Sequence, residues 1–238
     1  QDKVVKPGEP EWEHVKWVWR CSLITHLTAI HHLMWTHWII SNSFSTSLRE
    51  TLSPYHPVRR LLQVFAYNTP KINHNSVLSL HPESGMLHRM SPFTYNGLKQ
   101  VFADAAATYK FQTWEEFFKE MPVPPDVKVK LPMFEDGLPY WERLLAFCSG
   151  YVNLYFSGDA EVQADAELQE YWKFSCVPQY ARSIPPLSKV ALINHIARSV
   201  FDVTALHKLV GDVVAYTTDP AGAHMQARAG KDMSDLKQ

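Results

Sequence analysis

The chain has 238 residues, a formal net charge of −1 and 46% hydrophobic residues, which is the composition of an ordinary globular protein. This length predicts a single domain, 1–238, with a sizeable core, and the near-zero charge gives no support for a nucleic-acid partner. Three widely spaced cysteines form no disulfide framework or zinc motif, so we expect Cys21, Cys148 and Cys176 to be buried, reduced thiols.

The N-terminal part predicts a lead-in followed by a long helix. Residues 1–10 hold two prolines and a glycine and predict an extended segment, with no visible signal peptide. From Glu11 onward, the spacing of aromatic and aliphatic side chains predicts one helix that ends near Ile40.

Segment 22–40 is nearly all apolar, yet it holds four histidines, His26, His31, His32 and His37. A bilayer-spanning helix is disfavoured because each histidine would need a partner there, so we expect a buried core helix and no transmembrane helix. His32 and His37 are five residues apart, an offset of about 140° on a regular α-helix, which separates the two rings. A local i→i+5 bulge would bring both rings to one face, and such bulges cluster at functional sites.

The chain after this segment predicts short helices and loops. The polar run 41–47 is expected to end or break the long helix, and 48–52 to form one short helical turn. Further helices are predicted to begin near Pro57 and Pro70, because proline is well placed in a first helical turn. Residues 81–92 are punctuated by proline, serine and glycine and predict a loop.

The middle of the chain predicts a helix over 93–109, where apolar residues recur at helical spacing. Thr113 and Glu116, three residues apart, predict a capping box at the start of a short helix. Residues 121–132, MPVPPDVKVKLP, predict a surface loop because their prolines interrupt regular hydrogen bonding.

The C-terminal half predicts three further helices. An Asp-Gly turn at 136–137 leads into a helix over 138–156 with a regular apolar stripe. Another helix is expected over 159–174, with Asp165 and Glu167 solvated rather than catalytic.

The last helix is expected to follow Ser188, a plausible N-cap residue, and to cover about 189–216. Residues 218–238 have no apolar periodicity and predict a loosely packed tail. The whole pattern is all-α.

Four blocks of sequence resemble the lipoxygenase family. HHLMWTHWII carries His32 and His37 in an H-x4-H frame and resembles the first iron-ligand helix of that family. Segment 49–77 resembles its L-S-x-x-H-P-x-x-x-L-L…T-x-x-I-N block. LPMFEDGLPYW, from Leu131, and DAELQEYWKF, from Asp165, resemble two later blocks, Y-P-Y-R-D-D-G-L-x-x-W and D-x-E-L-Q-x-W. Their order and approximate spacing agree, so the chain is identified as similar to the central part of a lipoxygenase catalytic domain.

The resemblance implies a reduced helical lipoxygenase domain whose two long core helices carry the histidines. Lipoxygenases hold one non-haem iron and add dioxygen to polyunsaturated fatty acids. His32 and His37 match the first two iron ligands, and SVFDVTALHKLVGDV places His207 at the position of the third. The implied cofactor is therefore non-haem iron, and the implied substrate is a polyunsaturated lipid.

The sequence also departs from the family pattern. Gly211 stands at the fourth-ligand position and offers no side chain, although water or Asp212 could take that place. The chain ends at Gln238 without the family's terminal isoleucine, and the Glu-Pro that normally follows the first pair is missing. The family's N-terminal β-barrel has no counterpart, so we expect a protein partner to cover surfaces that a full domain buries.

The remaining histidines are expected to lie outside the metal site. His26 and His31 should flank it and face the second long helix or solvent, and His195 lies more than three helical turns before His207. His56 belongs to a structural His-Pro turn. Four more, His74, His81, His88 and His224, are expected in loops.

Three functional hypotheses stay open. The first is a lipoxygenase-like non-haem metal oxygenase, the second a non-catalytic lipoxygenase-derived subunit within a larger assembly. The third, a haem- or quinone-binding membrane helix, depends only on the histidine-rich apolar segment 22–40. An intracellular location, in the cytoplasm or a plastid, is expected.

Overall fold

The computed structural model describes residues 4–120, 132–174 and 178–212. Within these ranges all regular structure is helical, as predicted, and residues 4–10, which have no regular secondary structure, form turns and a bend from residue 7 onward. None of the described helices is long and apolar enough to cross a membrane. The tail 218–238 and most of the loop predicted over 121–132 lie outside the described residues.

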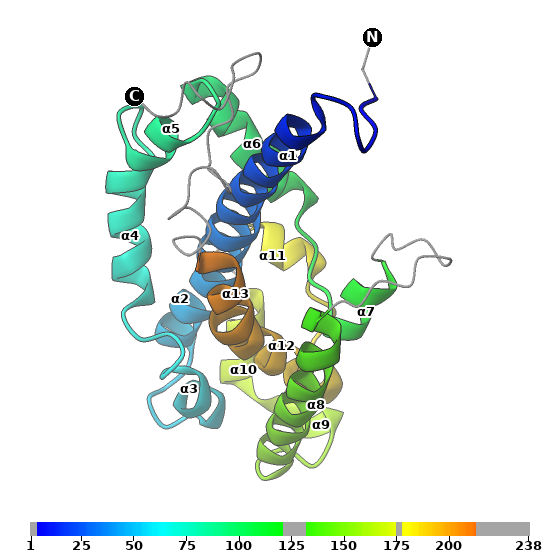
Figure 1. Cartoon of the computed structure of the whole chain (residues 1–238). Helices are drawn as coiled ribbons and strands as arrows, with labels where there is room; N and C mark the ends of the chain where they lie inside the picture. The colour runs from blue at the N-terminus through cyan, green and yellow to red at the C-terminus, as the bar shows by residue number, and fades with distance from the viewer. Residues whose placement is uncertain (1–3, 121–131, 175–177, 213–238) are drawn as a thin grey trace.

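One long helix runs diagonally through the molecule (Figure 1). It consists of α1 (Trp12–His26), the π-helix η1 (Leu27–Ser41) and α2 (Asn42–Thr51), and the residues at both junctions keep right-handed helical dihedrals. The predicted long helix and its i→i+5 bulge are confirmed. The predicted end or break at 41–47 is wrong, because the helix continues ten residues further as α2.

Serine hydroxyls explain why the polar run stays helical. The Ser41 hydroxyl donates to the His37 carbonyl at 2.6 Å, and the Ser47 hydroxyl donates to the Ser43 carbonyl at 2.6 Å. Such bonds to the preceding turn satisfy a hydroxyl without an external partner. Serines at these positions can therefore be buried inside the helix packing, and both are.

A second continuous helix packs against the first and completes the central pair (Figure 1). It consists of α12 (Lys189–Phe201), the π-helix η2 (Asp202–Leu206) and α13 (His207–Gly211). The predicted N-cap is confirmed, because the hydroxyl of Ser188 accepts a hydrogen bond from the Ala191 amide at 3.1 Å. The last part of the predicted helix lies outside the described residues.

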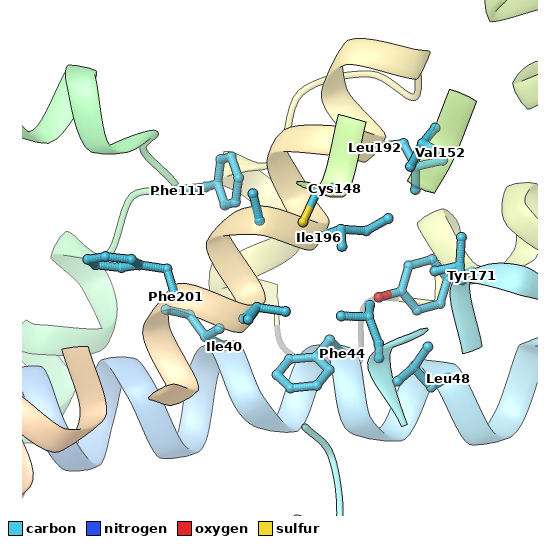
Figure 2. Close-up of a cluster of buried hydrophobic side chains, with 14 of the residues drawn as sticks. Ile40, Phe44, Leu48, Phe111, Cys148, Val152, Tyr171, Leu192, Ile196 and Phe201 are labelled. Atoms are coloured by element: carbon cyan, nitrogen blue, oxygen red, sulfur yellow. The ribbon is translucent and has the colours of Figure 1, made fainter. Parts of the chain in front are cut away.

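The main core fills the space between α2, α12, α8 (Pro132–Asn153) and α10 (Ala166–Lys173). Figure 2 shows Phe44 and Leu48 of α2 facing the side chains of α12. The ten labelled core residues are Ile40, Phe44, Leu48, Phe111, Cys148, Val152, Tyr171, Leu192, Ile196 and Phe201. Each is less than 9% exposed, so this layer fixes the position of α12 relative to the long helix.

The predicted Asp-Gly turn at 136–137 is wrong, because both residues lie inside α8. Glycine is needed here for close packing, because a Cβ at Gly137 would lie 2.7 Å from the indole ring of Trp114. The missing side chain lets the buried Trp114 ring rest directly on the α8 backbone.

Seven further helices among the described residues surround the core: α3 (Pro57–Leu62), α4 (Thr69–Leu80), α5 (Met86–Met90), α6 (Tyr95–Thr108), α7 (Trp114–Lys119), α9 (Asp159–Ala164) and α11 (Pro178–Ser183). Prolines open α3 and α4 as predicted. The predicted loop 81–92 is partly wrong, because α5 forms within it. The capping box is confirmed in both directions: Thr113 Oγ1 accepts from the Glu116 amide at 3.3 Å, and Glu116 Oε2 accepts from the Thr113 amide at 2.8 Å.

The predicted helix over 159–174 is divided into α9 and α10 by Asp165. This carboxylate caps α10 by accepting from the Leu168 amide at 3.0 Å, and its other oxygen lies 3.2 Å from His56 Nε2. Glu167 accepts from the Ser53 amide at 2.5 Å. The two acidic residues are therefore structural rather than freely solvated, and His56 has the structural role expected of it.

The described cysteines agree with the prediction of reduced thiols. Cys21 and Cys148 are each 1% exposed, and neither forms a disulfide. Burial raises the pKa of the Cys148 thiol to about 12, so this group stays protonated. Cys176 lies outside the described residues.

Candidate metal centre

Three imidazole rings from the two long helices meet at one point. The Nε2 atom of His37 lies 3.2 Å from that of His32 and 2.9 Å from that of His207, and His32 and His207 are 3.1 Å apart at the same atoms. The first pair comes from η1, and His207 begins α13 just after η2. The widened helical turns therefore bring together the three histidines that the sequence singles out.

The Thr36 hydroxyl forms a hydrogen bond across the widened turn of η1, next to the three histidines. Thr36 Oγ1 donates to the carbonyl of His31, five residues earlier, at 2.8 Å. On a regular α-helix His32 and His37 would point about 140° apart. On η1 their ring centroids are 4.9 Å apart, which places both rings on one side of the helix.

The electrostatic environment keeps the three rings neutral. Burial, together with smaller effects of the neighbouring His37 and His207 rings, lowers the pKa of His32 to about 3. Burial also lowers the pKa of His207, with a smaller effect of His37. The pKa of His37 is lowered by burial as well, although its hydrogen bond to Asn73 opposes that shift. Neutral imidazole is the form that coordinates a metal ion.

Asn73 of α4 orients the ring of His37. Its amide nitrogen donates to the His37 carbonyl at 2.8 Å and to Asn42 Oδ1 at 2.6 Å. Its Oδ1 therefore faces His37 Nδ1, at 2.8 Å, and accepts a hydrogen bond from the Nδ1–H group. The Nε2 lone pair of His37 consequently points at the other two rings. We did not single out Asn73 from the sequence, although it is the asparagine of the T-x-x-I-N block.

The donor set suits a single divalent metal ion. Two imidazole nitrogens each about 2.1 Å from one ion lie about 3.0 Å apart at a right angle and about 3.4 Å apart at a tetrahedral angle. The observed separations of 2.9–3.2 Å match three adjacent corners of an octahedron. Such a facial arrangement of imidazoles suits iron and related metals and leaves the other corners open.

Position 211 faces this centre from α13. A Cβ at Gly211 would lie 3.1 Å from Nε2 and 3.2 Å from Cε1 of His32. A longer side chain here would point at the metal position, which is where the family resemblance puts its fourth ligand. Asp212 does not take over that role, because its carboxylate pairs with Lys208 at 2.6 Å and is 47% exposed.

The other described histidines lie outside the centre, as predicted. His26 and His31 form a separate pair with Nε2 atoms 3.2 Å apart, and burial lowers the pKa of His31 to about 4. The loop assignments are wrong for two residues, because His74 lies in α4 and His88 lies in α5. His81 follows the last residue of α4, outside the helix as predicted, and its ring centroid lies 3.9 Å from that of Trp38. His224 lies outside the described residues.

His195 is a core residue, 2% exposed, with Tyr171 and Tyr180 hydroxyls at its two ring nitrogens. Burial lowers its pKa to about 3, whereas the unfolded chain protonates histidine near pH 6.5. As the pH falls from about 6.5 towards 3, the free energy of unfolding of the metal-free protein should therefore fall by up to about 1.4 kcal/mol per pH unit through this residue. Urea titrations between about pH 5 and pH 7 measure this slope.

The control for that prediction is His195→Gln, which cannot titrate. The variant should be less stable than the parent at neutral pH, since it loses a fitted side chain, but its stability should depend less steeply on pH. An equal slope in both proteins would contradict the role given to His195.

Comparison with known protein families identifies the relatives of this chain. A family model described as Lipoxygenase matches residues 2–177 of the chain, a range that includes His32 and His37 and ends before His207. Lipoxygenase 2, chloroplastic, of Tanacetum cinerariifolium is 26% identical over 199 residues, which cover 69% of this chain and 21% of that protein. Linoleate 9/13-lipoxygenase of Pseudomonas aeruginosa is 25% identical over 224 residues, which cover 87% and 31%.

Solved lipoxygenase structures share the fold. The chain superimposes on Delta413-417:GS LOX with a TM-score of 0.82 and 19% identity, over 99% of this chain and 38% of that one. It superimposes on the fungal lipoxygenase from Fusarium graminearum with a TM-score of 0.76 and 16% identity, over 99% and 39%. The chain thus spans between about a fifth and two fifths of the length of these relatives. Because the family model matches well over half of the chain, and the fold agrees across nearly all of it, the chain belongs to the lipoxygenase family.

Proposed function

We propose that His32, His37 and His207 hold one non-haem iron ion through their Nε2 atoms. The observation that carries this proposal is the convergence of the three nitrogens at 2.9–3.2 Å from two helices about 170 residues apart in sequence. Because Asn73 Oδ1 accepts a hydrogen bond from the Nδ1–H of His37, the neutral ring has no proton on Nε2 that would oppose a cation. A bound iron would supply one-electron redox chemistry, while the chain holds and orients its ligands.

We propose a lipoxygenase-type activity for this centre, the addition of dioxygen to a polyunsaturated fatty acid or a related lipid. The family membership supports it, as do relatives named linoleate lipoxygenases and a similar structure, with a TM-score of 0.80, that holds arachidonate. One relative is named chloroplastic, which is consistent with a plastid location for this chain. We propose an intracellular site of action on that basis.

The test is an activity assay of the iron-loaded chain with linoleate under air. Formation of a conjugated-diene hydroperoxide, lost when oxygen is removed and lost in His37→Ala, is the expected result. An iron-loaded chain that binds one iron per molecule but forms no hydroperoxide from linoleate or arachidonate would contradict the activity and leave the metal site intact.

Gly211 supports a second candidate function, that of a non-catalytic structural subunit. A glycine at the fourth-ligand position weakens the case for turnover, and several apolar side chains are well exposed: Tyr55 (87%), Tyr67 (83%), Leu154 (76%) and Val64 (66%). Such surfaces fit a lipoxygenase-derived structural subunit whose partner covers them. This alternative predicts a stable complex by gel filtration and no iron; a metal-binding monomer would contradict it.

Asn73→Leu tests how the metal site is oriented. The substitution removes the acceptor for His37 Nδ1 but keeps the side-chain volume, so the ring can rotate and present a protonated Nε2. Loss of such a partner weakens metal binding by about 10–100-fold. Titration with Co²⁺, followed by its visible absorption, measures the affinity. The matched control, Asn75→Leu, changes an exposed residue of the same helix and should leave the affinity unchanged. Equal affinity in the parent and in Asn73→Leu would contradict the role of Asn73.

A further inference from the structure

A pocket that is separate from the three histidines lies between α2, α3 and the segment after α3. Its volume is about 550 Å³, which is within the usual size of small-molecule sites. Figure 1 shows α2 and α3 adjacent at the lower left of the molecule. The polar groups on its wall come from Ser45, Arg49, Arg59 and Gln63.

The charge of this pocket is positive. Two arginines line it, and none of its lining residues is acidic. Arg59 is held in place because its Nη1 donates to the Leu52 carbonyl at 2.5 Å, and its other nitrogens remain available as donors. Arg49 is exposed on the facing helix. Paired guanidinium groups are the side chains that recognise phosphate by two parallel hydrogen bonds.

Ser45 supplies an independent sign of a missing ligand. This residue is 0% exposed and lines the pocket, yet its hydroxyl has no hydrogen-bond partner among the described residues. The neighbouring Ser41 and Ser47 hydroxyls both donate to the carbonyl one turn earlier. A buried hydroxyl without a partner is unfavourable, and an anionic oxygen in the pocket would accept a hydrogen bond from it.

The rim of the pocket is apolar. Val64 and Tyr67 line it and are 66% and 83% exposed. A free phosphate ion would leave most of the 550 Å³ and this rim unused. The combination of guanidinium groups with an exposed aromatic rim suits a phosphate that is attached to a larger, partly apolar molecule.

We propose that this pocket binds the phosphate group of an anionic organic phosphate, such as the headgroup of a phospholipid. Arg49 and Arg59 bind the phosphate oxygens, Ser45 donates a third hydrogen bond, and Tyr67 and Val64 contact the attached body. The site is independent of the metal centre, so it can be present whether or not iron binds.

The test uses the full chain, inorganic phosphate, and vesicles of phosphatidylcholine with and without phosphatidic acid. Arg49→Gln removes one charge from the pocket. Arg60→Gln is the matched control, because Arg60 is exposed on α3 and does not line the pocket. We expect Arg49→Gln to weaken binding by about tenfold or more, and Ser45→Ala to weaken it by several-fold, while Arg60→Gln stays within about twofold of the parent.

The two ligand sources are told apart by the same titrations. Tight binding to phosphatidic acid vesicles with weak binding of inorganic phosphate identifies a lipid headgroup; comparable binding of both identifies a soluble phosphate. Either result supports the site if Arg49→Gln weakens that binding by about tenfold or more. Binding of neither probe, equal binding to phosphatidylcholine alone, or equal losses in Arg49→Gln and Arg60→Gln would overturn the proposal.

Discussion

Replacing His207 with alanine should lower the iron content of the purified chain from about one ion per molecule to less than about a tenth of that value. The variant keeps His32 and His37 on one face of η1, but two imidazoles alone hold a divalent ion far less tightly than three. Iron is measured after reconstitution with ferrous iron and removal of excess, by complexation with a chromogenic chelator. The loss should be about the same for Co²⁺ and Zn²⁺, because the defect is in the number of ligands.

A thermal readout makes this prediction independent of activity. Added metal should raise the midpoint of thermal unfolding of the parent, because a ligand that binds only the folded state stabilises it. His207→Ala should show no such rise. His74→Ala, which changes an exposed histidine of α4, is the control and should behave like the parent. Full iron content in His207→Ala would contradict the three-histidine centre.

Replacing Asp202 with asparagine should lower the free energy of unfolding by about 3–5 kcal/mol. Asp202 is 0% exposed and accepts a hydrogen bond from Arg198 Nε at 2.7 Å. Burial raises the pKa of Asp202, and the Arg198 guanidinium opposes that rise. Asparagine keeps the shape but removes the negative charge, so the buried guanidinium loses its counter-charge. The pair lies in α12 and η2, just before His207, so the same change should also loosen the metal centre.

The control for Asp202→Asn is Asp212→Asn. Lys208 and Asp212 form an ion pair with the same four-residue spacing at 2.6 Å, but the two side chains are 79% and 47% exposed. Solvent screens such a pair, and its loss should cost about 0–1 kcal/mol. Urea unfolding of the metal-free proteins measures both. If Asp202→Asn and Asp212→Asn lowered the free energy of unfolding equally, burial would not determine the strength of the Arg198–Asp202 pair.

The three histidines could be predicted from sequence because their positions follow a pattern. His32 and His37 are useful together only if the helix widens, and five-residue spacing in an apolar segment indicated such a turn. His207 was placed by its resemblance to a second ligand helix. Which atoms meet depends on how α13 packs against η1, and that packing is a tertiary property that local spacing does not determine.

The errors of sequence reasoning have identifiable physical causes. The serines at 41–47 were expected to end the long helix, but Ser41 and Ser47 bond to carbonyls of the preceding turn and remain buried. Gly137 was expected to turn the chain, but it makes room for Trp114 inside α8. In both cases a contact or hydrogen bond formed by packing outweighs the local preference of the residue.

Asn73 illustrates a third limit of prediction from sequence. It lies 36 residues from His37, in another helix, and its importance depends on the three hydrogen-bond partners that fix which way its amide points. Periodicity alone carries no information about such a contact. Residues that orient a metal ligand are therefore found only when the neighbouring helix is placed.

The three-histidine iron centre can be tested with an anomalous difference map at the iron absorption edge, from crystals of the iron-loaded chain. We expect a single peak about 2.1–2.2 Å from the Nε2 atoms of His32, His37 and His207. A map with no peak among these three rings, or with a peak bound by other residues, would contradict it.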